Sequence, residues 1–231
     1  MWDGLAATLE GQLVVLEPLR AEHEDGLYEA ACDMDWTWMF VDAARSRDAF
    51  HAYFEAALET ARGGVEVPFA TLDADTRAPI GSTRFLTLRP EHRGLEIGWT
   101  WLTRSRWSGG SNVEAKLLQL EHAFERRGCM RVEFKTDAKN ERSRRALAAL
   151  PAQFEGVFRK HMLVGDDRDR LRDSAYYSIV EEDRLWRPDE ERVRPAPRSL
   201  ELPDPVADLL HRPSLRSRLA FTSGHSSSTI E

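Results

Sequence analysis

Short apolar runs and helically spaced apolar positions follow one another along most of the chain. The run at 12–17 predicts a strand, because it is apolar, rich in β-branched residues and followed by a proline. Helical patterns occupy 21–31 and the stretch from Ser46, a candidate N-cap, to the glycine pair 63–64. Three further runs predict an antiparallel meander, since short polar turns separate them: 65–72, 80–88 and 95–102.

The spacing of apolar residues changes after Gly109 and Gly110. A helix is predicted from there to Gly128. The later pattern predicts four elements, a strand at 130–135, a helix at 140–150, and strands at 154–163 and 174–180. A strand, helix and strand in succession indicate a parallel crossover beside the meander. We therefore expect an α/β (α+β) fold with a mixed, mostly antiparallel central sheet flanked by helices.

Composition changes beyond Trp186. Six of the chain's eleven prolines lie from Pro188 to Pro213, and serines gather near the end. Segments of this composition bury little apolar surface. We expect one domain over 1–186 and a C-terminal extension over 187–231 that is flexible or draped on the domain.

Charge and the absence of sorting signals restrict the partners. The 231 residues carry a formal net charge of −7, which argues against phosphate-backbone binding and fits a basic substrate better. No run approaches the roughly 20 apolar residues of a membrane span, and the N-terminus lacks a secretory pattern. We expect a cytoplasmic protein with no nucleic-acid or membrane partner.

The cysteines and histidines predict neither a disulfide framework nor a metal site. Cys32 and Cys129 are the only cysteines and lie far apart, without CxxC spacing. The histidines show no metal-ligand spacing. We expect two core thiols and no metal.

The segment 95–112 carries the clearest chemical signal. A predicted strand leads into a loop with Gly109 and Gly110, and the loop opens into a helix. The first amides of a helix have no intrahelical acceptor, and glycines let a phosphate approach the backbone, so this segment is suited to bind a pyrophosphate. The alternative is an ordinary turn. The loop is neither a Walker loop nor a GxGxxG motif.

Several ordered blocks resemble one superfamily. The segment 95–124, the block 132–137 and the Asn-Glu-Arg-Ser run at 140–143 resemble the GNAT superfamily of acyl-CoA-dependent N-acetyltransferases, in its RimJ/RimL-like branch. The resemblance covers about residues 9–186 and implies the GNAT fold. Two positions depart from the superfamily's loop pattern, which has Gln or Arg where Trp107 stands and Gly or Ala where Asn112 stands.

The resemblance implies where acetyl-CoA, the co-substrate, would bind. The pyrophosphate would lie on main-chain amides of the loop, and the pantetheine beside the end of the preceding strand. Asn140 and Ser143 would also contact CoA, although a helix N-cap is the other interpretation of Asn140. The implied cofactor-binding residues are Trp101, Leu102, Trp107, Ser108, Gly109, Gly110, Ser111, Asn112, Asn140 and Ser143.

Glu96 is the candidate general base, since a carboxylate on the strand just before the loop could take the proton of an amine. Strict alternation would place Leu95, Ile97, Trp99 and Trp101 on one face of that strand, and Glu96, Gly98 and Thr100 on the other. The alternative for Glu96 is a structural carboxylate. By resemblance, the Ser143 hydroxyl is a candidate proton donor to the leaving thiolate.

Acceptor-binding candidates lie in two places. Trp36 and Trp38 fall between the first two predicted helices, with Asp33 and Asp35 beside them, where the superfamily builds part of its acceptor site. Core packing is the alternative for the tryptophans. Thr83 lies on the strand next to the one that bears Glu96, and an ordinary strand residue is its alternative.

The sequence as a whole is interpreted as an acyl-CoA-dependent N-acyltransferase. It would move an acetyl group from acetyl-CoA to a primary amine, a protein N-terminal α-amine or a small amine, by direct attack in a ternary complex. Two alternatives stay open, a non-catalytic acyl-CoA-binding module and an enzyme that uses another donor such as succinyl-CoA. A homodimer is expected from the resemblance alone.

Overall fold

The computed structural model describes residues 3–150 and 152–183. These residues form one compact unit. The predicted extension over 187–231 and its boundary lie outside them. No helix in the described part of the chain is long and apolar enough to cross a membrane.

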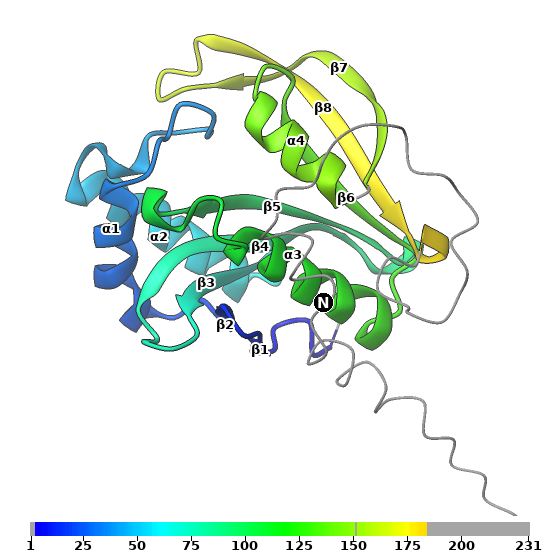
Figure 1. Cartoon of the computed structure of the whole chain (residues 1–231). Coiled ribbons are helices and arrows are strands. Elements are labelled where there is room, and N and C mark those ends of the chain that lie inside the picture. The colour runs from blue at the N-terminus through cyan, green and yellow to red at the C-terminus, as the bar shows by residue number, and fades with distance from the viewer. Residues whose placement is uncertain (1–2, 151, 184–231) are drawn as a thin grey trace, which may run out of the picture. The chain divides into compact units, whose positions relative to one another are not determined.

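One mixed sheet organises the unit, and helices cover both of its faces (Figure 1). Its strands stand in the order β1-β2-β3-β4-β5-β6-β8-β7. All neighbouring strands are antiparallel except β5 and β6, which are parallel. The strands are β1 (Leu9–Glu10), β2 (Val14–Pro18), β3 (Val67–Asp73), β4 (Pro79–Arg89), β5 (Gly94–Leu102), β6 (Arg131–Asp137), β7 (Gln153–Val164) and β8 (Arg170–Val180). The predicted mixed, mostly antiparallel sheet is confirmed.

Four α-helices match the predicted helical segments. They are α1 (Glu24–Cys32), α2 (Arg47–Arg62), α3 (Ser111–Glu121) and α4 (Glu141–Ala149). The Ser46 side chain accepts a hydrogen bond from the Ala49 amide at 3.1 Å, which confirms it as the N-cap of α2. A π-helical turn, His122–Arg126, continues α3 toward Gly128.

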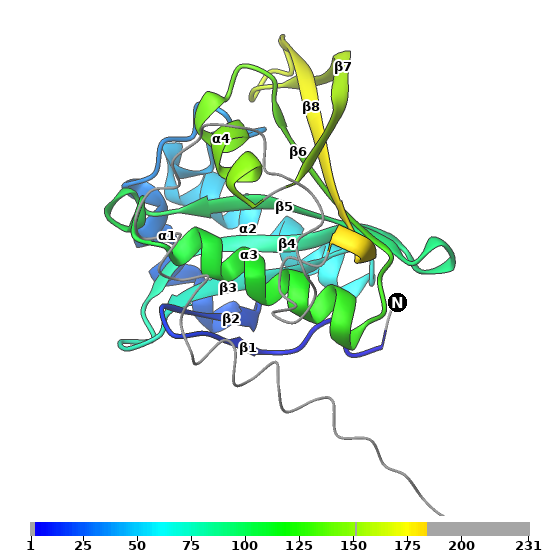
Figure 2. The same cartoon turned by 45° about the vertical axis from the view of Figure 1, so that its right-hand side comes forward.

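The two faces of the sheet have separate apolar cores. On one face, α1 and α2 pack on β2, β3 and β5 through a buried cluster that includes Phe50, Phe54, Leu72 and Trp101. On the other face, α3 and its π-helical turn cover the strands, and Phe85 of β4 stacks on His122. Figure 2 shows β6, β7 and β8 turning away from the rest of the sheet beyond β5. The unit therefore has a sheet packed on both faces, and the sheet divides between β5 and β6.

Candidate active site

The parallel strands β5 and β6 separate after a short paired stretch. Their pairing consists of Gly94 with Arg131, Leu95 with Val132, and Glu96 with Glu133. Beyond Glu96, β5 continues to Leu102 and β6 to Asp137, and β6 pairs with β8 over its whole length. The β6-facing edge of β5 is thus left without a strand partner in the described residues. Backbone groups on this edge that lack a side-chain partner could bind a ligand that enters between the two strands.

A β-bulge lies just beyond this point. The pairing of β4 with β5 shifts between Ser82 and Arg84, and Trp99 has a φ of 50°. The bulge adds one residue to β5, so the side chains after Gly98 lie on the faces opposite to those that strict alternation predicts. The expected alternation holds through Gly98 and is wrong beyond it, because Trp101 packs with the α2 cluster and Thr100 contacts Lys116 of α3.

Glu96 is buried at the last position where β5 pairs with β6. Its Oε2 accepts hydrogen bonds from Lys135 Nζ at 2.9 Å and Thr87 Oγ1 at 3.2 Å, and only 3% of the residue is exposed. Burial raises the pKa of the carboxyl, while the Lys135 ammonium opposes that rise. A Cβ on Gly98 would lie 3.2 Å from Glu96 Oε1, so the glycine leaves room for the carboxylate.

A row of polar side chains beside Glu96 was not predicted. Lys135 of β6 is in register with Tyr176 of β8, and the Tyr176 ring contacts His161 of β7. Arg172 lies four residues before Tyr176 on the same strand and is also buried. Alternation along β6 and β8 places these groups on one face. That alternation is visible in the sequence, but the pairing of β6 with β8 is not.

The start of α3 has free main-chain donors. Gly110 is the N-cap of α3 and has a φ of 87°. No side chain caps this end of the helix in the described chain. Within the described chain, the amides of Ser108 to Asn112 make no hydrogen bond. A Cβ added to Gly109 would meet only the carbonyl oxygen of Arg106, at 3.8 Å, so the space around Gly109 is open. Such an arrangement can hold a phosphate group.

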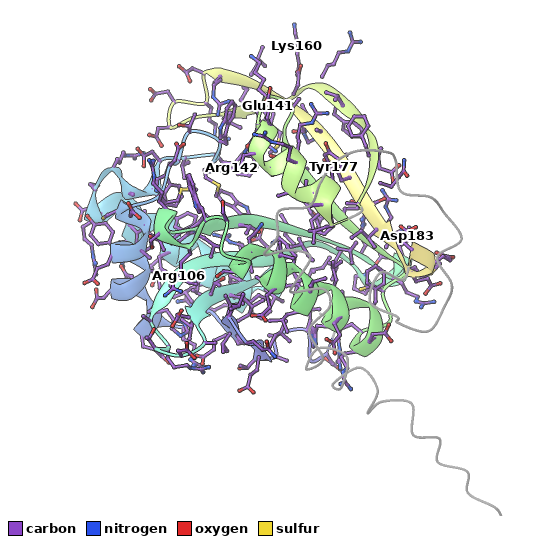
Figure 3. All side chains as sticks on the ribbon, viewed as in Figure 1. Arg106, Glu141, Arg142, Lys160, Tyr177 and Asp183 are labelled. Atoms are coloured by element: carbon purple, nitrogen blue, oxygen red, sulfur yellow. The ribbon has the colours of Figure 1, made fainter. Side chains whose placement is uncertain are left out.

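Two side chains fix the loop before α3. Trp107 Nε1 donates to the Leu102 carbonyl at 3.0 Å, and the guanidinium of Arg142 lies 3.6 Å from the centre of the Trp107 ring. Figure 3 labels Arg142 beside Glu141 at the start of α4. Trp107 therefore has a structural role in this chain, at a position where the superfamily pattern has Gln or Arg.

Glu114, in the first turn of α3, binds the chain between β1 and β2. Its carboxylate is fully buried and accepts the amides of Gln12, Leu13 and Val14 at 2.9, 2.6 and 2.8 Å. The turn between β1 and β2 is thereby attached to the first turns of α3. Three charge-assisted hydrogen bonds make this attachment strong.

The helix after β6 begins as the capping interpretation predicts. The Asn140 side chain accepts the Ser143 amide at 3.1 Å, so Asn140 is the N-cap of α4. Ser143 is half-buried in the first turn of the helix, next to Arg142. Its hydroxyl group is not part of the cap, because the cap uses the backbone nitrogen.

The acceptor candidates are divided between the faces of the sheet. Trp36 is buried, donates to the Ala31 carbonyl at 3.0 Å and packs on Trp101 and Tyr53. Trp38 is half-buried in the same segment. Thr83 is completely buried on the α3 side, bonded to Thr100 and Lys116, so the structure does not bring it to Glu96. Its geometry is that of an ordinary strand residue.

A cavity of about 460 Å³ lies at the segment between α1 and α2. Two carboxylates, Asp35 and Asp42, line it together with Trp36 and Arg104, and Cys32, Met34, Thr37 and Ala44 complete its wall. The Asp35 carboxylate accepts hydrogen bonds from the Thr37 side chain and amide, which lower its pKa. An ionised carboxylate in this position can attract an amine. No cluster of ligands for a metal ion occurs among residues 3–150 and 152–183.

Comparison with known proteins defines the class of this chain. The family model of the acetyltransferase (GNAT) domain matches residues 14–152, more than half of the chain. The chain therefore belongs to the GNAT acetyltransferases, and it is an acyltransferase by family and fold.

Solved structures support this assignment. A GCN5-related N-acetyltransferase from Brucella melitensis is 28% identical and superposes with a TM-score of 0.71, over 77% of this chain and 80% of its own. Mycobacterium smegmatis RimJ, solved in complex with CoA-disulfide, is 22% identical with a TM-score of 0.64, over 79% of this chain and 91% of its own. The second likeness shows a shared fold. A search of curated proteins finds no match.

Proposed function

We propose that this enzyme transfers an acetyl group from acetyl-CoA to a primary amine, by direct attack within a ternary complex. One observation carries the proposal. The strands β5 and β6 separate at Glu96, and the free amides that begin α3 follow the same strand. A thioester between the strands and a base at their point of separation would meet there.

The residues present fit the coenzyme. The amides of Ser108, Gly109, Gly110, Ser111 and Asn112 would hold the pyrophosphate, since they point from a helix start and lack partners in the described chain. The main chain at Trp101 and Leu102 would lie beside the pantetheine. Trp107 would support the loop, and Asn140 and Ser143 would contact CoA from α4. When bound, acetyl-CoA supplies an activated thioester carbonyl.

Glu96 would act as the general base. Removing a proton at pH 7 costs about 1 kcal/mol for an α-amine and about 4.6 kcal/mol for a lysine side chain, from their reference pKa values. A carboxylate whose pKa is raised by burial is a better match for this task than an exposed one. Lys135 would keep it ionised and oriented, through its 2.9 Å contact. The Ser143 hydroxyl would donate a proton to the leaving thiolate.

The acceptor amine would approach from the segment between α1 and α2. The cavity there is lined by the carboxylates of Asp35 and Asp42 and by one cation, Arg104, so its balance of charge favours a cationic ligand. Trp36 forms its apolar wall. Trp38 lies in the same segment and would contact the acceptor. The resemblance to the RimJ/RimL-like branch supports a protein N-terminal α-amine or a small amine as the acceptor.

The proposal is tested by measuring CoA release from acetyl-CoA with peptides, polyamines, amino acids and aminoglycosides as acceptors. Calorimetry with CoA measures binding separately. We expect CoA to bind and at least one class of amine to accelerate thiol release. Absence of both CoA binding and thiol release would refute the proposal.

A further inference from the structure

Arg172 is a buried cation for which the structure provides no anionic partner. Only 4% of the residue is exposed, and its Nε is buried without a hydrogen bond. Among the described residues, the guanidinium takes part in no ion pair or hydrogen bond, and it lies 4.8 Å from the centre of the Phe40 ring. A buried charge of this kind is costly unless an anion neutralises it.

The nearest carboxylates already bind other groups. Asp137 and Glu96 are the carboxylates that raise the pKa of Arg172, against the larger lowering by burial. Asp137 accepts from Arg170 Nη1 at 3.1 Å and from the Lys139 amide at 2.9 Å. Glu96 accepts from Lys135. The described chain therefore leaves Arg172 unneutralised, although anions that bind other cations lie near it.

Arg172 and Glu96 lie on the same face of the sheet, on opposite sides of the separation between β5 and β6. Tyr176 of β8 is in register with Lys135, which contacts Glu96, and Arg172 lies four residues from Tyr176 along the strand. Side chains separated by an even number of residues share a face. Phe40 connects the two sides, because its ring contacts the Arg172 guanidinium and lies 4.7 Å from the Trp99 ring of β5.

Basic side chains gather on β7, the strand that pairs with β8 beside Arg172. The ring of His161 contacts Tyr176, and burial together with the charges of Lys135 and Arg172 lowers the pKa of His161. His161 also lines a cavity of about 810 Å³ with Phe158, Arg159 and Lys160 on β7. Figure 3 shows Lys160 projecting from this edge. Positive charge gathered beside a buried, unneutralised arginine favours an anionic ligand.

We propose that Arg172 binds a carboxylate carried by one of the two reactants, the amine acceptor or the acyl group of the CoA thioester, and thereby selects for that reactant. The proposal rests on the proposed function and specifies its substrate class. A guanidinium can bind both oxygens of a carboxylate, which provides orientation as well as charge. Arg172 would be a specificity-determining residue, and the acyl transfer chemistry would remain with the groups around Glu96.

The experiment compares matched reactants that differ in one carboxylate. The acceptor pairs are the dipeptide Ala-Ala with its C-terminal amide, and the tripeptide amides Ser-Glu-Ala with Ser-Gln-Ala, each with acetyl-CoA. The donor pair is succinyl-CoA with acetyl-CoA, each with alaninamide. Thiol release gives kcat and KM for the wild-type enzyme, Arg172→Met, Arg172→Lys and the control Arg62→Met. Arg62 is exposed on α2 and pairs with Glu55 and Glu59.

We expect the wild-type enzyme to prefer the carboxylate-bearing member of at least one pair by about tenfold or more in kcat/KM. In Arg172→Met this preference falls to about twofold or less, mainly through KM, while the neutral member keeps its rate within about threefold. Arg172→Lys keeps part of the preference and Arg62→Met keeps all of it. The pair that responds shows whether the carboxylate belongs to the acceptor or to the acyl group.

Three outcomes would overturn the proposal. The first is an equal kcat/KM for both members of every pair in the wild-type enzyme. The second is a preference that survives in Arg172→Met. The third is an equal fall in kcat/KM for both members in that variant, which would indicate a structural role. If no amine is acetylated, the proposed function fails by itself, and calorimetry decides this proposal. Succinyl-CoA must then bind the wild-type protein more tightly than acetyl-CoA, or succinate more tightly than succinamide, and Arg172→Met must abolish that difference. Equal binding within both pairs would overturn it.

Discussion

The guanidinium of Arg142 lies 3.6 Å from the centre of the Trp107 ring. This contact joins the first turn of α4 to the loop that precedes α3. The two elements follow β6 and β5, the strands that separate after Glu96. A single cation–π contact therefore links the two sides of the proposed coenzyme site at its outer end.

Replacing Trp107 should weaken coenzyme binding without unfolding the domain. Trp107→Leu removes both the contact with Arg142 and the hydrogen bond to the Leu102 carbonyl. We expect the Kd for CoA to rise about tenfold, since each contact contributes about 1 kcal/mol. Trp107→Phe keeps an aromatic ring and should lose about threefold. Calorimetry checks both values, and equal affinities in all three proteins would contradict this role for the loop.

Glu96→Gln should lower kcat by about 100-fold or more while the affinity for CoA is unchanged. The neutral amide cannot accept the proton of the amine, but it is close in size to the carboxylate. Glu133→Gln is the matched control, because Glu133 lies in register with Glu96 and pairs with Arg131 and Arg89. It should retain most of its turnover. An unchanged rate in Glu96→Gln would remove this carboxylate from the mechanism.

Lys135→Met should move the acid limb of the pH–rate profile to higher pH. The Lys135 ammonium lowers the pKa of Glu96 against the effect of burial. Without the ammonium, the pKa rises further, so the carboxylate is ionised only at higher pH and kcat/KM increases later as pH rises. The comparison with wild type uses one acceptor amine, so the titration of the amine cancels. A limb at the same pH in both proteins would argue against Glu96 as the base.

Lys116→Met should stabilise the protein, most strongly at low pH. Burial lowers the pKa of Lys116 to about 7, against about 10.5 in the unfolded chain. Below pH 7 the buried ammonium is charged, and its cost to the free energy of unfolding is largest. Between pH 7 and 10.5 the unfolded chain holds a proton that the folded chain has lost, so the stability of the wild-type protein rises with pH. We expect a gain of about 2–5 kcal/mol at pH 6 that shrinks toward pH 10. Urea denaturation of this variant and of exposed Lys139→Met provides the test, and equal pH dependence in both would refute it.

Glu114→Ala should destabilise the fold through the attachment of β1 and β2 to α3. It removes the acceptor of three main-chain amides, those of Gln12, Leu13 and Val14. We expect a loss of about 2–4 kcal/mol in the free energy of unfolding, because the buried Val14 amide is left unpaired and two partly buried amides lose their acceptor. Glu114→Gln keeps one oxygen and should lose about half as much. Chemical denaturation distinguishes the two variants, and losses below about 1 kcal/mol would show that water replaces the carboxylate.

The fold was predictable because its signals are local. The N-cap Ser46, the glycine pair before α3 and the apolar runs of β3, β4 and β5 determine their elements within a few residues. Strand β1 was missed, since two residues carry too little pattern to recognise. The bulge at Trp99 was also missed, because a positive φ at a non-glycine residue leaves no mark in the sequence.

The candidate site was only partly predictable, because half of it depends on contacts between distant segments. Glu96 and the loop around Gly110 lie in one continuous stretch and could be identified together. Lys135 and Arg172 reach the same face only through the pairing of β6 with β8, which periodicity does not reveal. Thr83 was placed near Glu96 by adjacency of strands, but it points to the opposite face and contacts α3.

The early parting of β5 from β6 has a consequence for how this enzyme can change over time. Main-chain nitrogens and oxygens along that edge, and at the helix start that follows it, are supplied by any residue whose backbone adopts the same path. In the proposed site, the donor contacts made by this main chain would therefore depend little on which amino acids occupy the stretch. Asn112 could then stand in place of the superfamily's glycine or alanine without loss of a main-chain donor, whereas Trp107 would be kept for its contacts with Arg142 and with the Leu102 carbonyl.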